Sequence, residues 1–215
     1  MPLDVVRAAD APRMRDELVF GDNSCLFGRT LMDPRLQRLL DHFDIREVIE
    51  AYVHACDRGD RDATADVYHS DSWDDHGFIK CTGPEFADKN TEALMTRWKS
   101  CNHLLGQSRI NVGSYVAGAE TLFYASLTRD ANGTQMLDQM VGRYIDRFER
   151  RRGQWRLIER RVVSEWTSSA PIGEDYLGGH LFLQGQRSEH DLSYEVLGLR
   201  RGCSRIVRSE ESSSG

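Results

Sequence analysis

Four long strand-like segments joined by very short turns fill the second half of the chain, and this pattern limits the possible folds more than any other feature. The segments span about residues 103–112, 115–129, 135–151 and 154–167. Turn signals separate them at Gly113-Ser114, Asn132-Gly133 and Arg152-Gly153. Asn-Gly between two strand-like segments is a strong signal for a hairpin. Because turns of this length join antiparallel neighbours, the sequence predicts a run of long antiparallel strands.

Helical patterns precede these strands. Asp33 and Pro34 indicate the start of a short helix, and Asp44 followed by Glu47 indicates the capped start of a longer one. The longer helix has an apolar stripe at the spacing of a core-facing surface, made up of Ile45, Val48, Ile49, Tyr52, Val53 and Cys56. We expect it to end near Gly59.

Shorter elements connect this helix to the strands. Asp60 indicates the start of another short helix, residues 72–79 are typical of a short strand, and residues 86–100 return to helical spacing. Helices followed by a run of antiparallel strands predict an α+β domain. In the expected fold, a cone-shaped curved antiparallel sheet wraps around the N-terminal helices and leaves a pocket inside the cone.

Three regions are expected along the 215 residues. Residues 1–32 mix charged residues and glycine without periodicity and are predicted to form an N-terminal arm. Residues 33–168 form the α+β domain, and residues 169–215 form a C-terminal extension with a flexible end. Within this extension, the apolar run 181–183 is expected to be buried, and a neighbouring subunit of a homo-oligomer, dimer or trimer, is one surface that would bury it.

Composition excludes several classes of function. The net charge of −6 and the isoelectric point near 5.7 provide no general attraction for nucleic acid or for an anionic membrane. We found no apolar run of the length of a membrane span or a signal peptide, so a cytoplasmic location is expected. Five cysteines form no CxxC pair and are expected to be reduced thiols: Cys25, Cys56, Cys81, Cys101 and Cys203.

Candidate catalytic residues begin with a carboxylate on the long helix. Asp57 borders the buried stripe that also contains Tyr52, and a carboxylate there requires a partner. His103 starts the first long strand directly after a helical pattern and is a chemically useful partner, because a neutral imidazole can act as a general base. Cys56 beside Asp57 suggests a thiolate nucleophile as an alternative, but its place in the stripe favours a small core residue.

An arginine on the last strand completes this set. Arg160 has the strand parity of Ile158 and Val162, so it lies on a face with aliphatic neighbours. A buried guanidinium can donate hydrogen bonds to developing negative charge. Arg161 remains an alternative, because one bulge in the strand would exchange the two faces. Together, Tyr52, Asp57, His103 and Arg160 predict a proton-transfer site.

Aromatic residues and a histidine are candidates for the pocket wall. His76 follows Asp74 and Asp75, which would allow a metal cluster, but no second histidine lies at ligand spacing, so pocket lining is favoured. The predicted substrate pocket contains His76, Trp73, Phe78, Tyr144 and Trp166, with Trp98, Leu105, Tyr124 and Met140 as further candidates. Ordinary core packing is the alternative for all of these residues except His76, and it is favoured for most of them.

Several strings of the sequence resemble a known family. They are DIREVIEAYVHACD at 44–57, RGDRDATADVYHSD at 58–71, WDDHG at 73–77 and GQWRLIERR at 153–161. Together with a histidine after a helix, they resemble the SnoaL-like group of the nuclear-transport-factor-2-like superfamily over roughly residues 33–168. Its members include a bile-acid 7α-dehydratase, scytalone dehydratase and a hexachlorocyclohexane dehydrochlorinase, as well as modules that only bind ligands.

The resemblance implies a cofactor-independent and metal-independent lyase with Asp57 and His103 as a catalytic dyad. Tyr52 stands five positions before Asp57, where the bile-acid enzyme has an aromatic residue and the dehydrochlorinase has a lysine, so loss of water is favoured over loss of halide. Arg160 stands five positions after Trp155, as in these relatives. The expected substrate is small and hydrophobic, alicyclic or steroid-like. An isomerase, a dehydrohalogenase and a non-catalytic ligand-binding or assembly module remain alternatives.

Overall fold

A computed structural model describes residues 33–174 and 178–205 of the chain. Helices α1 (Pro34–Arg58) and α2 (Arg61–Asp66) come first, followed by strands β1 (Tyr68–Asp75) and β2 (Lys80–Thr82) and helix α3 (Gly83–Arg97). The four long strands are β3 (Ser100–Val112), β4 (Val116–Ala131), β5 (Thr134–Arg151) and β6 (Gln154–Pro171). A 3-10 turn, η1 (Gly179–Leu181), and helix α4 (Leu192–Leu197) complete the chain. The predicted α+β fold is confirmed.

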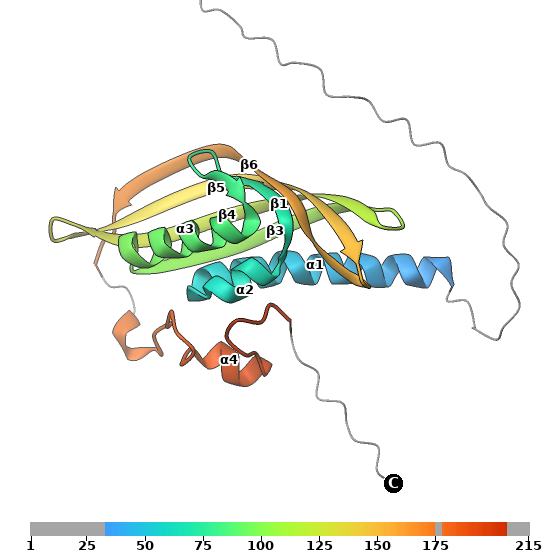
Figure 1. Ribbon diagram of the computed structural model, residues 1–215. Coiled ribbons are helices and arrows are strands. Elements are labelled where there is room, and N and C mark those ends of the chain that lie inside the picture. The colour runs from blue at the N-terminus through green and yellow to red at the C-terminus, as the bar shows by residue number, and fades with distance from the viewer. Residues whose placement is uncertain (1–32, 175–177, 206–215) are drawn as a thin grey trace, which may run out of the picture. The chain divides into compact units, whose positions relative to one another are not determined.

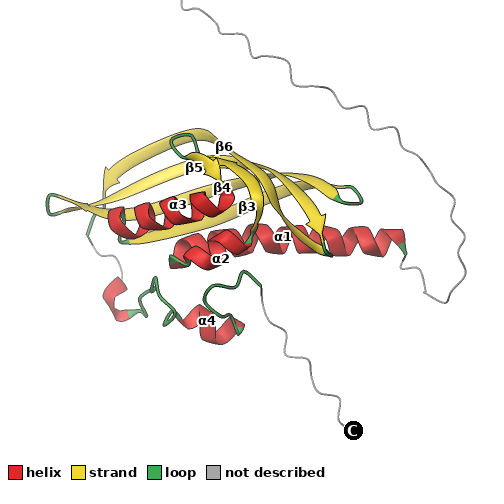
Figure 2. Ribbon diagram, in the orientation of Figure 1, coloured by secondary structure: helices red, strands yellow, loops and turns green. Residues whose placement is uncertain are grey.

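The strands form one curved, open sheet of six strands in the order β2-β1-β6-β5-β4-β3. Helices α1 and α3 lie on the same side of this sheet, as Figures 1 and 2 show. The long strands pair antiparallel as predicted, whereas β1 pairs with β6 in parallel. This parallel pair requires a long connection, which the chain supplies through β2, α3 and the other strands. It brings the WDDHG segment beside the last long strand.

Two of the predicted hairpin turns have the backbone that two-residue turns require. Asn132 and Gly133 both have positive φ angles, of 53° and 82°. Arg152 and Gly153 have φ angles of 54° and 79°. Positive φ at both central residues defines the type I′ turn, whose twist matches that of the flanking strands. These turns join β4 to β5 and β5 to β6; the β4–β5 pairing keeps one register along its length, whereas the β5–β6 pairing shifts register at two points.

The two helices predicted around Asp44 form one continuous helix, α1. Asp33 caps it, since its side chain accepts a hydrogen bond from the Arg35 backbone N–H at 2.8 Å. Asp44 lies inside the helix and caps nothing, because no proline or glycine interrupts the chain before it. The helix ends at Gly59, whose left-handed backbone (φ 63°) accommodates the C-cap.

The core lies between α1, α3 and the concave face of the sheet. Most of the predicted apolar stripe of α1 is buried, with Ile45 and Ile49 fully covered. At one end of the helix, buried Asp41 accepts hydrogen bonds from Trp155 Nε1 at 3.0 Å and Arg150 Nη1 at 2.7 Å. These two bonds connect α1 to the turn between β5 and β6, and so fix the helix across the sheet.

The described part of the C-terminal extension packs on the hairpin of α1 and α2. Asp60, which caps α2, also accepts hydrogen bonds from the Tyr194 hydroxyl at 3.0 Å and the Gly202 backbone N–H at 2.9 Å. Residues 181–183, expected to be buried, are largely exposed in the single chain. The predicted N-terminal arm, 1–32, and the last seven residues, which were predicted to be flexible, lie outside the described residues.

Among the described helices, none is long and apolar enough to span a membrane.

We expect Asp60→Ala to destabilise the protein by about 2–4 kcal/mol, because it removes the cap of α2 and leaves Tyr194 and Gly202 without their acceptor. Asp62→Ala is the matched control, since Asp62 is exposed and pairs only with exposed Arg61. It should cost less than about 1 kcal/mol. Urea unfolding measures both changes, and equal losses would contradict the anchoring role of Asp60.

Candidate active site

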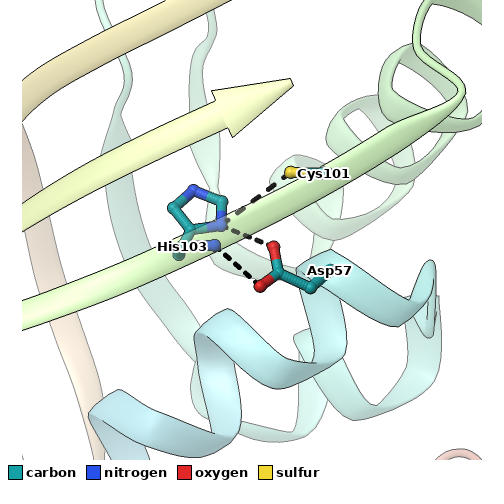
Figure 3. Close-up of side chains that lie close together, drawn as sticks. All are labelled: Asp57, Cys101 and His103. Carbon is teal, nitrogen blue, oxygen red and sulfur yellow. Dashed lines mark hydrogen bonds and ion pairs between the residues drawn. The ribbon is translucent and has the colours of Figure 1, made fainter. Parts of the chain in front are cut away.

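Asp57 and His103 form a close hydrogen-bonded pair, which Figure 3 shows. His103 Nδ1 lies 2.7 Å from Asp57 Oδ1, and the His103 backbone N–H donates to Asp57 Oδ2 at 2.8 Å. Asp57 comes from the last turn of α1, and His103 comes from β3. Their side chains are only 12% and 13% exposed. Both carboxylate oxygens are therefore used to fix one histidine residue.

This geometry fixes the tautomer of the imidazole. An ionised carboxylate only accepts hydrogen bonds, so the ring nitrogen that faces it, Nδ1, must carry a proton. In neutral His103, Nε2 is then the nitrogen with a free lone pair. His103 lies in the wall of a cavity, whereas Asp57 is placed behind it. The pair thus offers a base at the cavity surface, oriented by a carboxylate from the rear.

The cavity has a volume of about 500 Å³ and lies between α1, α3 and the concave face of the sheet. Its apolar wall includes Leu94, Trp98, Phe123, Leu127, Met140 and Val162. A polar part of the wall contains Asn90, Gln139, Thr167, Ser168 and Ser169. A mostly apolar cavity with a few convergent polar groups is the common form of a small-molecule site.

Tyr52 lies in the same cavity wall, and Arg160 lies directly behind it. The Arg160 guanidinium carbon is 4.0 Å from the centre of the Tyr52 ring and 4.1 Å from that of Tyr144. The arginine is fully buried and forms a two-pronged ion pair with Asp146, at 2.8 and 2.7 Å. Arg160 is therefore not part of the cavity surface, and any effect it has on a substrate is transmitted through the two tyrosines.

An irregularity in β6 explains why Arg160 points inward. Its pairing with β5 shifts between Phe148, opposite Leu157, and Arg147, opposite Glu159, so one residue of β6 is inserted near Ile158. Leu157 and Arg160 consequently share the buried face, although they are three positions apart and would lie on opposite faces of a regular strand. Arg161 points the other way, with its side chain 68% exposed and paired with Glu159. Arg160, not Arg161, thus faces the core.

His76 belongs to a second histidine–carboxylate pair at the cavity wall. Its Nδ1 contacts fully buried Asp74, and its Nε2 lies 3.1 Å from the Tyr52 hydroxyl. Asp74 also accepts a hydrogen bond from the Tyr68 hydroxyl at 2.5 Å. The His76 ring stacks on Phe86 of α3, with 4.1 Å between ring centres. Tyr52, His76, Asp74 and Tyr68 are therefore connected in one chain of polar contacts.

The thiols near the dyad are neutral. Burial raises the pKa of Cys56 to about 12 and raises the pKa of Cys101 further, with the charge of Asp57 acting in the same direction on both. Asp57, Cys101 and His103 place possible metal-ligand atoms within 4.8 Å of one another. The raised pKa of Cys101 opposes the thiolate that would bind a metal, and His103 Nδ1 is already engaged by Asp57. The residues present therefore fit a metal poorly.

Not all predicted pocket residues line the cavity. Phe78, Tyr144 and His76 do. Trp73 and Trp166 lie on the outside, 46% and 47% exposed. Trp73 alternates with buried Ser72 and Asp74 along β1, so it faces outward. Near Trp166, the pairing of β6 with β5 shifts register a second time, next to Gly142. Of the further candidates, Trp98 and Met140 line the cavity and Leu105 and Tyr124 do not.

Three important residues were missed by the sequence analysis. Asp146 alternates with Tyr144 and Phe148 along β5, and this parity could have identified it as an inward carboxylate. Asp138, at the cavity, holds Trp98 through a hydrogen bond of 2.9 Å from Nε1. Arg187 donates to the Leu94 and Trp98 carbonyls at the end of α3, at 2.8 and 2.9 Å. No local pattern signals Arg187, because its partners are about ninety residues away.

The fold and the cavity define an α+β protein of the nuclear-transport-factor-2-like superfamily. The sequence profile of the SnoaL-like domain matches residues 37–161. The chain belongs to this family, as its sequence strings predicted. No curated protein matches the sequence.

Solved structures support the fold at low sequence identity. A protein from Novosphingobium aromaticivorans, provisionally named a scytalone dehydratase, is 18% identical with a TM-score of 0.56 and covers 66% of this chain and 99% of its own. The hexachlorocyclohexane dehydrochlorinase LinA-type3 from Novosphingobium barchaimii is 17% identical with a TM-score of 0.57, covering 66% and 97%. A further LinA structure is 19% identical with a TM-score of 0.58, covering 67% and 97%. At these identities the similarity shows the fold alone.

We expect Arg160→Met to destabilise the protein by about 3–5 kcal/mol, because it leaves the buried Asp146 carboxylate without a partner. Arg161→Met is the matched control on the neighbouring residue, and it should cost less than about 1 kcal/mol. The double variant Arg160→Met with Asp146→Leu should recover most of the loss. Urea unfolding of the three variants tests this, and similar costs for the two arginines would contradict the structure.

Proposed function

We propose that this protein is a cofactor-independent lyase, a dehydratase that eliminates water from a hydroxylated alicyclic or steroid-like substrate. The observation that supports this most directly is the Asp57–His103 pair in the wall of an apolar cavity. A base that is already oriented by a carboxylate is suited to removing a proton from carbon. Such a positioned base contributes about 10²–10⁴-fold to a rate.

In the proposed reaction, His103 Nε2 takes a proton from the carbon next to a carbonyl or another acidifying group. Asp57 keeps the proton on Nδ1 and stabilises the imidazolium that forms. Because Asp57 also binds the backbone N–H of His103, the ring has little freedom to turn away from the cavity. The carbon–oxygen bond then breaks, and the electron pair of the broken carbon–hydrogen bond becomes the new double bond.

Tyr52 is the proposed hydrogen-bond donor to an oxygen atom of the substrate. Burial raises the pKa of Tyr52 well above its usual value, and Arg160 acts in the opposite direction. The tyrosine therefore retains its O–H at neutral pH and can donate a hydrogen bond. The Arg160 guanidinium carbon lies 4.0 Å from the centre of the Tyr52 ring, and its charge stabilises negative charge that develops on the substrate oxygen bound by Tyr52. This role for Arg160 is indirect, since it does not reach the cavity surface.

The cavity suits a small, mostly apolar substrate. Its aromatic and aliphatic wall would hold a ring skeleton, and the polar residues Gln139 and 167–169 would bind oxygen atoms. Family neighbours named for dehydration and for dehydrochlorination fit the same reaction type, abstraction of a proton from carbon with loss of a neighbouring group. An isomerase would need only the proton abstraction, and a binding module would need neither step.

We expect the protein to convert β-hydroxy ketones on one-ring and two-ring skeletons into enones, and His103→Ala to lower kcat by about 10²–10⁴-fold. A panel containing 3-hydroxycyclohexanone, 3-hydroxyindan-1-one and hydroxysteroid ketones, followed by enone absorbance, measures this. His42→Ala is the matched control, because His42 is exposed and lies outside the cavity. Equal turnover by His103→Ala would remove His103 from the mechanism. Tight binding of panel members without turnover would instead favour a ligand-binding module.

We expect Asp57→Asn to lower kcat by about 10²–10⁴-fold while the fold is retained. The asparagine carbonyl can still accept from the His103 backbone, but its amide group would donate to Nδ1. The ring proton would then move to Nε2, and the base would be lost from the cavity side. Enone formation gives kcat, and thermal unfolding shows whether the fold persists. Full activity of Asp57→Asn would exclude the orienting role.

A further inference from the structure

Polar and ring contacts fix the His76–Asp74 pair, which takes no part in the reaction steps proposed for His103, Asp57 and Tyr52. His76 is fixed by its backbone, since its N–H donates to the Ile79 carbonyl at 2.9 Å and Phe78 donates back to the His76 carbonyl at 2.9 Å. Asp75 caps the turn by accepting from the Gly77 N–H at 2.9 Å. The ring is clamped between Phe86 and the Tyr52 hydroxyl. The position and orientation of the ring are therefore fixed by the turn and by its neighbours.

The two ring nitrogens of His76 have different hydrogen-bond partners. Nδ1 faces the Asp74 carboxylate, which can only accept, so Nδ1 carries a proton. Nε2 faces the oxygen of Tyr52 at 3.1 Å. When Nε2 is also protonated, it donates to this oxygen and the tyrosine O–H is free to donate toward the cavity. After the tyrosine has given up that proton, His76 can replace it.

The charged groups around this pair form a buried layer. Asp74 and Asp146 are both fully or almost fully buried, and Arg160 is the buried cation beside them. The strand register places Asp74 and Asp146 on either side of Arg160, one on β1 and one on β5. Two carboxylates and one guanidinium leave one negative charge in a buried layer, which is unfavourable.

We infer that His76, held by Asp74, supplies the proton that the departing hydroxyl takes up through Tyr52, and that the substrate is therefore a β-hydroxy carbonyl compound whose leaving group requires protonation. This inference rests on the proposed function. His103 removes the proton from carbon, the carbon–oxygen bond breaks, and the oxygen leaves as water with the proton of Tyr52. His76 Nε2 reprotonates Tyr52. One proton has then moved from His76 to His103, and exchange with solvent restores both residues.

A change of leaving group separates this role from a structural one. Acetate is a stable anion and departs without a proton, whereas hydroxide is a strong base and does not. We therefore compare 3-hydroxyindan-1-one with 3-acetoxyindan-1-one as probes, which share one skeleton and yield the same enone. His76→Gln retains a side chain of hydrogen-bonding atoms but cannot transfer a proton.

We expect His76→Gln to lower kcat for the hydroxy ketone by about 10²–10⁴-fold and to leave kcat for the acetate almost unchanged. His103→Ala should lower both. His42→Gln, at an exposed histidine outside the cavity, serves as the control and should change neither. If His76→Gln does not fold, Tyr52→Phe should give the same selective loss, because it removes only the hydroxyl and retains the ring that contacts Arg160 and Tyr144.

The other outcomes overturn the inference in distinguishable ways. Equal losses with both probes would mean that His76 is only a packing residue, and no loss with either would mean that it takes no part. In both cases the proposed dehydratase would stand, since the wild-type protein still forms the enone. Elimination of acetate but not of water by the wild-type protein would overturn the His76 role and the dehydratase, while leaving a lyase with His103 as its base. No elimination from either probe would overturn both proposals.

Discussion

The buried ion pair between Arg160 and Asp146 is the interaction on which the arrangement of the cavity depends. It joins β5 to β6, and the guanidinium fills the space between the rings of Tyr52 and Tyr144. Tyr52 comes from α1, so one cation connects the helix to the sheet. A charge in this position is tolerated only because a two-pronged carboxylate and two aromatic faces replace its hydration shell. Tyr52 and Tyr144, which cover this buried ion pair, are part of the cavity wall.

Two histidine–carboxylate pairs lie at this cavity, each with its histidine in the wall, and they are assembled in different ways. Asp57 and His103 are contributed by α1 and β3, so their contact exists only when the helix packs on the sheet. Asp74 and His76 are neighbours in one turn, and that turn is placed by the parallel pairing of β1 with β6. Elimination of water needs a base at the carbon and a proton for the oxygen. Two separate pairs provide one site for each task in the mechanism that we propose.

Local patterns predicted the elements well where local physics decides them. The hairpin turns at Asn132 and Arg152 need positive φ angles, which the residues present can adopt, and the strands followed in register. Prediction failed where a distant partner or an inserted residue intervened. Asp44 looked like a cap, but the helix continues through it. Arg160 and Arg161 could not be distinguished by parity, because the irregularity near Ile158 is a property of strand pairing and leaves no local signal.

The sequence by itself determined the α+β class and the family, because hydrophobic spacing, turn chemistry and characteristic strings are local properties of the chain. It also suggested four residues for a proton-transfer site. Only the tertiary structure decided which groups meet. It placed Asp57 against His103, withdrew Arg160 behind Tyr52 and brought His76 into contact with Tyr52. These contacts join residues up to 108 positions apart. They depend on how α1 and β1 pack against a curved sheet, which no short segment specifies.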